Sequence, residues 1–159
     1  MKKILLCIAI VIGFCYSIMA QGGANDPAFN TLDNLIIGNG TGFDGQVRTI
    51  CIQPDGKILV GGSFATFNGI SRKGILRLNN NSTLDTTFNI GSGFGISYTI
   101  STISIQSNGK IIVGGIFQSF NGIAKYCLLR LNSDGSLDNS FNIGNSNSTF
   151  DYVSTTSIQ

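Results

Sequence analysis

Apolar and polar residues are arranged along this chain as strands and turns require. Residues 47–53 alternate between the two classes, which predicts a half-buried strand. Residues 57–64 contain the uninterrupted apolar run Ile58-Leu59-Val60, which indicates a strand buried on both faces. No segment has the three-and-four spacing of an amphipathic helix. The unit is completed by turns at 54–56, 67–69 and 80–82 and by strands at 73–79 and 84–90.

The same pattern recurs 53 positions later. Residues 53–91 align with residues 106–144 without a gap, and 22 of the 39 aligned positions are identical. Four antiparallel strands in each unit, buried on both faces, predict an all-β fold made of β-propeller blades. The glycine pairs Gly61-Gly62 and Gly114-Gly115 fit this interpretation, because a strand close to another sheet leaves no room for Cβ atoms. A two-sheet sandwich is the alternative fold, and the strict repeat register counts against it.

The first twenty residues have the pattern of a secretory signal peptide. Lys2 and Lys3 precede an almost unbroken apolar run at 4–19, and Ala20 supplies a small residue before the expected cleavage. The alternative is an N-terminal membrane anchor, but the run is short for a helix of about 20 apolar residues. We therefore expect residues 21–159 to form a propeller segment, with blades at about 40–91 and 92–144 and a partial blade at 145–159.

Removal of the leader changes the charge balance. The whole chain has 10 basic and 8 acidic residues, and loss of Lys2 and Lys3 leaves eight of each. A nucleic-acid partner would require a cationic patch, so the sequence predicts no nucleic-acid binding. We also expect no stable membrane insertion after cleavage and a secreted, extracellular or cell-surface location.

The residues available for chemistry are few. The sequence has neither His nor Glu, which excludes a Ser-His-Asp or Cys-His arrangement, a His-ligated metal and a Glu general acid. We expect no enzymatic activity and no cofactor. After cleavage two cysteines are left, Cys51 and Cys127, and their aligned positions, Ser104 and Gly74, place them in different strands of different units. Two separate thiols are therefore favoured over a disulfide.

Two arginines interrupt apolar strands at the same place in each unit. Arg77 and Arg130 lie eight residues before Asp85 and Asp138. A half-buried guanidinium needs a carboxylate partner, so we expect the structural pairs Arg77–Asp85 and Arg130–Asp138, each within its own blade.

Calcium is a weaker alternative use of one acidic segment. Asn132, Asp134 and Asp138, together with Ser136, alternate as oxygen donors around Gly135. The aligned segment of the first unit keeps a single carboxylate, Asp85, which is too little charge for a repeated site. A hairpin turn is the favoured interpretation of this segment.

The order of these motifs resembles the delta-60 repeat family of bacterial β-propeller repeats. The resemblance rests on DGKILVGGSF, then FNG, RLN and LDTTFN, which recur in the same order in the second unit. It implies a multi-bladed propeller of the kind found in secreted or surface proteins, and it does not imply an enzyme. The sequence departs from the pattern at Asn108 and at Asn81-Ser82, which replace residues of the two turns.

The ends of the chain suggest an incomplete ring. A further D-x-x-F-N motif occurs at 26–30, and the last residue aligns with Gln53 and Gln106. About two and a half blades are fewer than the four to eight of closed propellers, so we expect an open arc whose second blade exposes an apolar face. The remaining blades of a longer protein or self-association would cover that face.

These observations favour a secreted or cell-surface binding, adhesion or structural module with an unknown extracellular protein or glycan ligand. The alternatives are the propeller part of a secreted hydrolase whose catalytic residues lie elsewhere, and a fragment without function.

Overall fold

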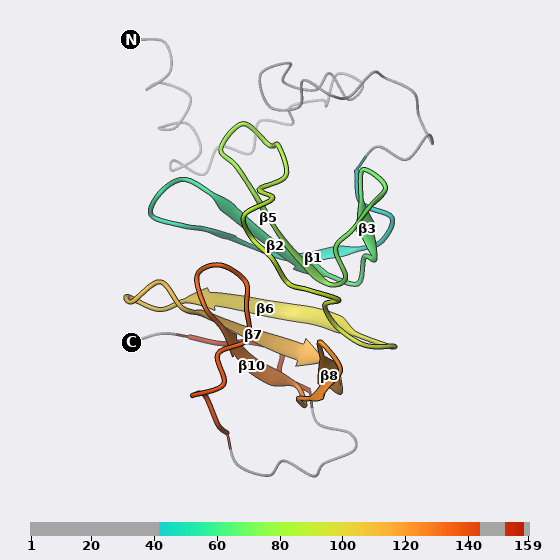
Figure 1. Cartoon of the computed structure of the whole chain (residues 1–159), viewed down its shortest axis with the longest axis vertical. Coiled ribbons are helices and arrows are strands. Elements are labelled where there is room, and N and C mark those ends of the chain that lie inside the picture. The colour runs from blue at the N-terminus through green and yellow to red at the C-terminus, as the bar shows by residue number, and fades with distance from the viewer. Residues whose placement is uncertain (1–41, 144–151, 158–159) are drawn as a thin grey trace, which may run out of the picture.

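The computed structural model describes residues 42–143 and 152–157. Within these ranges the regular structure is all β, in two three-stranded antiparallel sheets and two small hairpins (Figure 1). No helix in this part of the chain is long and apolar enough to cross a membrane. The predicted signal peptide at 1–20 and the motif at 26–30 lie outside the described residues.

The first sheet, which we call blade 1, has the strand order β1-β2-β5. The chain enters a small hairpin between β2 and β5, where Asn68 and Gly69 have φ angles of 50° and 74°. This is the left-handed geometry that an Asn-Gly turn favours, as the sequence predicts. The elements of blade 1 are β1 (Val47–Ile52), β2 (Ile58–Gly62), β3 (Thr66–Phe67), β4 (Ile70–Ser71) and β5 (Ile75–Leu78).

The second sheet, blade 2, repeats this arrangement with the order β10-β7-β6. The two sheets have the same pairing register. Leu59 pairs with Arg77 inside blade 1, and the equivalent residue Ile112 pairs with Arg130 inside blade 2. The 53-residue period of the sequence is therefore a structural period. The elements of blade 2 are β6 (Thr99–Ile105), β7 (Ile111–Ile116), β8 (Ser119–Phe120), β9 (Ile123–Ala124) and β10 (Leu128–Leu131).

The predicted fourth strand of each blade is much shorter than expected. In blade 1 it is reduced to a single bridge between Leu78 and Leu84, and in blade 2 to the bridge between Leu131 and Leu137. The reason lies in Asp85, whose Oδ1 accepts a hydrogen bond from Thr87 N at 3.0 Å and whose carbonyl accepts one from Phe88 N at 3.2 Å. These bonds close a turn at the place where a strand would have to continue.

The two blades stack face to face around one apolar core (Figure 1). Blade 1 contributes side chains such as Leu59 and Ile75, and blade 2 contributes Ile100 and Ile103 of β6. A Cβ on Gly61 would lie 2.8 Å from the Ile100 Cγ2 and Ile103 Cδ1 methyl groups. The sheets therefore approach so closely at this point that only glycine fits.

The other three glycines of the two pairs are also enclosed. A Cβ on Gly62 would collide with the Gln46 carbonyl oxygen, and one on Gly115 would collide with the Thr99 carbonyl oxygen. These two glycines permit close pairing inside a blade. Gly114 instead faces the next segment of the chain, because its Cβ would lie 2.6 Å from Val153 Cγ1.

Residues 152–157 lie along blade 2 as β6 lies along blade 1. Val153 N donates to the Gly115 carbonyl at 3.1 Å, and Thr156 Oγ1 lies 3.0 Å from Thr102 Oγ1. Val153 and Thr156 align with Ile100 and Ile103 of β6, so this segment has the position of the first strand of a third repeat. The expectation that blade 2 would present the open apolar face therefore needs correction, because this segment covers part of that face.

Candidate functional site

Each blade holds a cluster of charged side chains around one buried aspartate. In blade 1, Asp85 Oδ2 accepts hydrogen bonds from Lys57 Nζ at 2.6 Å and from Arg77 Nε at 2.8 Å. Its other oxygen, Oδ1, accepts bonds from the Thr87 backbone N at 3.0 Å and from the Thr87 hydroxyl at 2.6 Å. Both carboxylate oxygens are therefore fully engaged by the protein itself.

Blade 2 repeats this cluster atom for atom. Asp138 Oδ2 accepts from Lys110 Nζ at 2.7 Å and from Arg130 Nε at 2.6 Å. Its Oδ1 accepts from Ser140 N at 3.0 Å and from Ser140 Oγ at 2.7 Å. The structure thus brings together both Arg–Asp pairs that the sequence predicts, each inside its own blade.

The strands and a neighbouring ring fix the position of each arginine. Arg77 lies in β5 and its guanidinium carbon lies 4.9 Å from the centroid of the Phe88 ring. Arg130 in β10 lies 4.7 Å from the Phe141 ring centroid. A cation over an aromatic face gains electrostatic attraction while it keeps its in-plane donors for the carboxylate.

The clusters keep both aspartates ionised. Burial tends to raise the pKa of Asp85, but the hydrogen bonds from Lys57, Thr87 and Arg77 outweigh it and hold this pKa well below its usual range. Hydrogen bonds from Lys110 and Ser140 likewise lower the pKa of Asp138. A carboxylate held in this state is a poor general acid, which makes a structural role the better account of both residues.

The cluster of blade 1 also joins the two blades. Arg77 Nη1 donates to the Ser133 carbonyl at 2.7 Å, and Asn89 N donates to the Asp134 carbonyl at 2.7 Å. A Cβ on Gly135 would lie 3.1 Å from backbone atoms of Asn89. The turn at 133–135 of blade 2 therefore rests directly on the segment that follows Asp85 in blade 1. We call this contact the interblade joint.

The two carboxylates considered for calcium are bound by donors of the protein itself. Asp138 is occupied by Lys110, Arg130 and Ser140, and Asp134 Oδ1 accepts from Ser136 N at 2.9 Å and Ser136 Oγ at 2.6 Å. In the described ranges no group of three or more acidic, Cys or His side chains is placed to hold a metal. Since both carboxylates are engaged by the protein itself, a turn is favoured over the calcium interpretation of Asn132, Asp134 and Asp138.

Several members of the clusters were missed in the sequence. Lys57 and Lys110 are among the identical residues of the repeat, but a lysine at the start of a strand is usually a solvent-facing residue. Gln53 lies within 3.4 Å of Arg77 Nη1, and its identical counterpart Gln106 lies 3.5 Å from Arg130 Nη1. Identity between the copies at polar positions was the signal that marked these residues.

The two cysteines of the repeat region lie apart and form no disulfide. Cys127 has a φ of 61° where the first copy has Gly74 with a φ of 80°. Burial raises the pKa of the Cys51 thiol, which reduces its reactivity. Neither the environment of Cys51 nor the buried position of Cys127 suggests a nucleophile.

The hairpins at β3–β4 and β8–β9 present the same side chains to solvent. Ile70 is 47% exposed and Ile123 is 48% exposed. Two residues farther on, Arg72 and Lys125 are held alike, because Arg72 N donates to the Ala65 carbonyl at 2.8 Å and Lys125 N donates to the Gln118 carbonyl at 3.1 Å.

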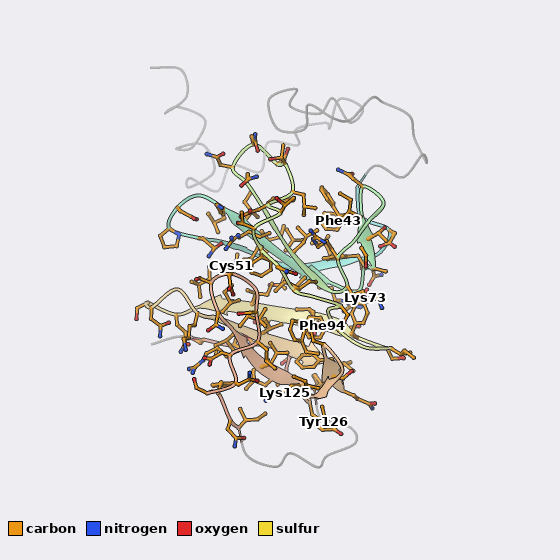
Figure 2. The ribbon with its side chains drawn as sticks, viewed as in Figure 1. Phe43, Cys51, Lys73, Phe94, Lys125 and Tyr126 are labelled. Carbon is orange, nitrogen blue, oxygen red and sulfur yellow. The ribbon has the colours of Figure 1, made fainter. Side chains whose placement is uncertain are left out.

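In Figure 1 the labels β3 and β8 lie at the same end of the two sheets, and Lys125 is labelled in Figure 2. We call Ile70, Arg72, Ile123 and Lys125 the hairpin surface.

Comparison with known proteins identifies the repeat. Residues 53–88 and 106–141 each match the family described as "Domain of unknown function (DUF5122) beta-propeller". Both repeats of the chain are therefore similar to repeats of this β-propeller family. The matched ranges include every residue of the two charged clusters, Lys57 and Lys110 among them. Neither the search of curated proteins nor the search of solved structures found a match.

Proposed function

We propose that the chain is an exported, non-enzymatic binding module built from propeller repeats of the delta-60 type. The observation that carries the proposal is the hairpin surface, in which each blade offers one exposed isoleucine and one cation in the same backbone setting. Single exposed apolar residues are common on proteins, but their repetition at equivalent places on two blades suits a ligand that spans both.

The charged residues of the two clusters are engaged inside the protein, which supports a binding role over an enzymatic one. Asp85 and Asp138 are bound by cations and hydroxyl groups of their own blades, so they offer nothing to a substrate. The hairpin surface carries Arg72 and Lys125 outside these clusters. An extracellular protein or glycan with anionic or other acceptor groups would complement these two cations.

Export is proposed from the first twenty residues alone. Lys2 and Lys3, the apolar run at 4–19 and Ala20 have the order that a signal peptidase substrate requires. N-terminal sequencing of the protein from the culture medium or cell surface tests this step. We expect the mature chain to begin at Gln21, and a product that still begins at Met1 would contradict export by cleavage.

Binding is tested by probing arrays of extracellular proteins and of glycans with the chain and with four variants. We expect a captured ligand to be lost in the double variant Ile70→Asp/Ile123→Asp and weakened in each single variant. The matched control is Ile96→Asp, because Ile96 is 95% exposed but lies outside both hairpins. Capture that is equal in the double variant and the control, or no capture on either array, would contradict the proposal.

A further inference from the structure

Charge is distributed unevenly between the two ends of the sheets. We call the end where β1 passes into β2 and where β5 and β10 finish the turn end. In the described ranges it carries as many carboxylates as cations, and every one of its cations belongs to a charged cluster. The turn end is therefore electrically neutral. Its charged residues are Asp55, Lys57, Arg77, Asp85, Lys110, Arg130, Asp134 and Asp138.

The opposite end, which we call the hairpin end because it carries β3–β4 and β8–β9, has an excess of cations. Among its described residues Asp44 is the single carboxylate, and its Oδ1 accepts hydrogen bonds from Ala65 N and Thr66 N, both at 2.8 Å. The described part of this end has a net charge of +3. The equal numbers of acids and bases in the sequence from residue 21 onward therefore conceal a local excess of positive charge. The cations of the hairpin end are Arg48, Arg72, Lys73 and Lys125.

Three of these cations are available to a ligand. Within residues 42–143 and 152–157, Arg72, Lys73 and Lys125 form no ion pair. Lys73 is exposed, and Arg72 and Lys125 are partly exposed. Arg72 Nη1 donates to the neighbouring Ser71 carbonyl at 2.8 Å, which leaves the positive charge of the guanidinium without a counterion.

Residues 91–95 join the two hairpins into one continuous surface. A Cβ on Gly93 would lie 3.1 Å from Lys73 Cβ, and Gly93 N donates to Asn121 Oδ1 at 3.0 Å. The Ser92 hydroxyl donates to the same oxygen at 3.2 Å, and Asn121 lies in the turn between β8 and β9. A single residue, Gly93, therefore contacts both Lys73 of blade 1 and the hairpin of blade 2 that carries Lys125 (Figure 2).

Each hairpin offers one apolar group and one cation. Blade 1 presents Ile70 with Arg72, and blade 2 presents Ile123 with Lys125. A uronic acid unit, which is a sugar with a carboxylate, has the complementary groups, because its C–H groups suit an isoleucine and its carboxylate suits a cation. A ligand that repeats such a unit can use both hairpins at once, which raises its affinity without any new type of contact.

We propose that the hairpin end binds an acidic polysaccharide, a polymer with carboxylates on regularly spaced sugar units. This inference rests on the proposed function and adds the chemical class of the ligand. An acidic protein segment fits less well, because its acidic and apolar side chains do not recur at a fixed spacing. A single-stranded nucleic acid would require aromatic side chains on which its bases stack, and the aligned positions Lys73 and Tyr126 do not supply an aromatic pair.

The test measures binding of the full chain to polygalacturonate and to alginate by isothermal titration calorimetry at low ionic strength. Neutral dextran, poly-L-glutamate and single-stranded DNA are titrated in the same way. The double variant Arg72→Gln/Lys125→Gln removes the equivalent cations of the two hairpins.

The repeat supplies two matched controls. Asn81→Asp/Asn108→Asp changes the net charge by the same two units, but at the turn end, and gives each position the aspartate that the other copy carries. Arg72→Lys/Lys125→Arg exchanges the residues of the two copies and keeps both positive charges. Circular dichroism of each variant checks that the fold is retained.

We expect the original chain to bind at least one of the two acidic polysaccharides and not dextran, with an affinity that falls as salt is added. The dissociation constant should rise by at least about fivefold in Arg72→Gln/Lys125→Gln, because two exposed charge pairs are lost. Both controls should stay within about twofold of the original chain, since the cations of the hairpin end are kept.

Several results would overturn the proposal. One is the absence of binding to both acidic polysaccharides, and another is an equal affinity of Arg72→Gln/Lys125→Gln and Asn81→Asp/Asn108→Asp. Equal or tighter binding of poly-L-glutamate or of single-stranded DNA would assign the surface to an acidic protein or to a nucleic acid.

Failure of this inference differs from failure of the proposed function. An array ligand that is lost in Ile70→Asp/Ile123→Asp but kept in Arg72→Gln/Lys125→Gln would leave a binding module whose ligand is not an acidic polysaccharide. Absence of any captured ligand on either array would contradict the binding module itself.

Discussion

Because of the interblade joint, we expect substitutions at two aligned turn positions to have different effects on the free energy of unfolding. Gly135 in blade 2 and Ser82 in blade 1 both have left-handed backbone geometry, with φ angles of 92° and 64°. A Cβ at position 135 would lie 3.1 Å from the N, C and O atoms of Asn89. Ser82 already carries a Cβ, and its hydroxyl donates to the Asn81 carbonyl at 2.6 Å. We therefore compare Gly135→Ser with the reverse change Ser82→Gly.

The expected cost at position 135 has two parts. A residue with a Cβ in the left-handed region costs about 1–2 kcal/mol relative to glycine. Forcing that Cβ against the Asn89 backbone adds an overpacking cost of about 1–2 kcal/mol, because backbone atoms cannot rotate away as a side-chain end can. We expect Gly135→Ser to lower the free energy of unfolding by about 2–4 kcal/mol.

The reverse change should have little effect. Ser82→Gly relieves the left-handed strain but removes an exposed hydrogen bond and makes the unfolded chain more flexible. These contributions have opposite signs, so the free energy of unfolding should stay within about 1 kcal/mol of the original. Position 82 is thus a control for the backbone geometry without the interblade contact.

The assay is urea unfolding of the full chain, followed by far-ultraviolet circular dichroism at neutral pH. Equal slopes for the three proteins would allow the midpoints to be compared directly. A Gly135→Ser variant within about 0.5 kcal/mol of the original would refute the interblade joint at this turn. A loss as large in Ser82→Gly would show that the turn geometry alone sets the cost.

Three further outcomes follow from the charged clusters, the glycine contact and the thiols. Folding lowers the pKa values of Asp85 and Asp138, so their contribution to stability is complete above about pH 4 and declines as the pH falls below it. An Asp85→Asn/Asp138→Asn variant should therefore lose less stability than the original chain on acidification. Urea unfolding from about pH 7 to about pH 2.5 measures this difference. Gly61→Ala should lower the free energy of unfolding by about 1–3 kcal/mol, since the added methyl group would lie 2.8 Å from methyl groups of β6. In the unfolded chain that begins at Gln21, Cys51 and Cys127 should both react with a maleimide without prior reduction, and a mass spectrum without two adducts would contradict separate thiols.

Much of the fold was predictable because it repeats. The period of 53 residues predicted that the two blades would have the same strand arrangement. An arginine inside an apolar strand, as at Arg77, indicated that a carboxylate partner lies close to it. The prediction of a full fourth strand was wrong for a local reason. The Asp85 side chain accepts a hydrogen bond from the Thr87 backbone and closes a turn, which the apolar periodicity does not reveal. An aspartate side chain that bonds to nearby backbone N–H groups competes with the strand hydrogen bonds, so the aspartate is the residue that indicates such a turn.

The interblade joint could not have been predicted from the sequence. Two of its hydrogen bonds end on the main-chain carbonyls of Ser133 and Asp134, and a main-chain carbonyl has no signature in the residue types. Gly135 was visible as a turn residue, but its contact with Asn89 depends on how the two sheets stack. The sequence analysis assigned the open face to blade 2 because the segment at 152–157 was not expected to cover it, whereas exposed apolar side chains lie on β1.

The most direct test of the account is whether blade 1 and blade 2 pack face to face at Gly61. In the full chain with labelled isoleucine methyl groups, nuclear Overhauser effects from the Gly61 α protons to the Ile103 Cδ1 and Ile100 Cγ2 methyl groups report this contact. We expect strong cross-peaks to both methyl groups, because each would lie 2.8 Å from a Cβ placed on Gly61. Strong intrablade cross-peaks from Gly61 to Thr49 without any to Ile100 or Ile103 would contradict the stacked propeller blades.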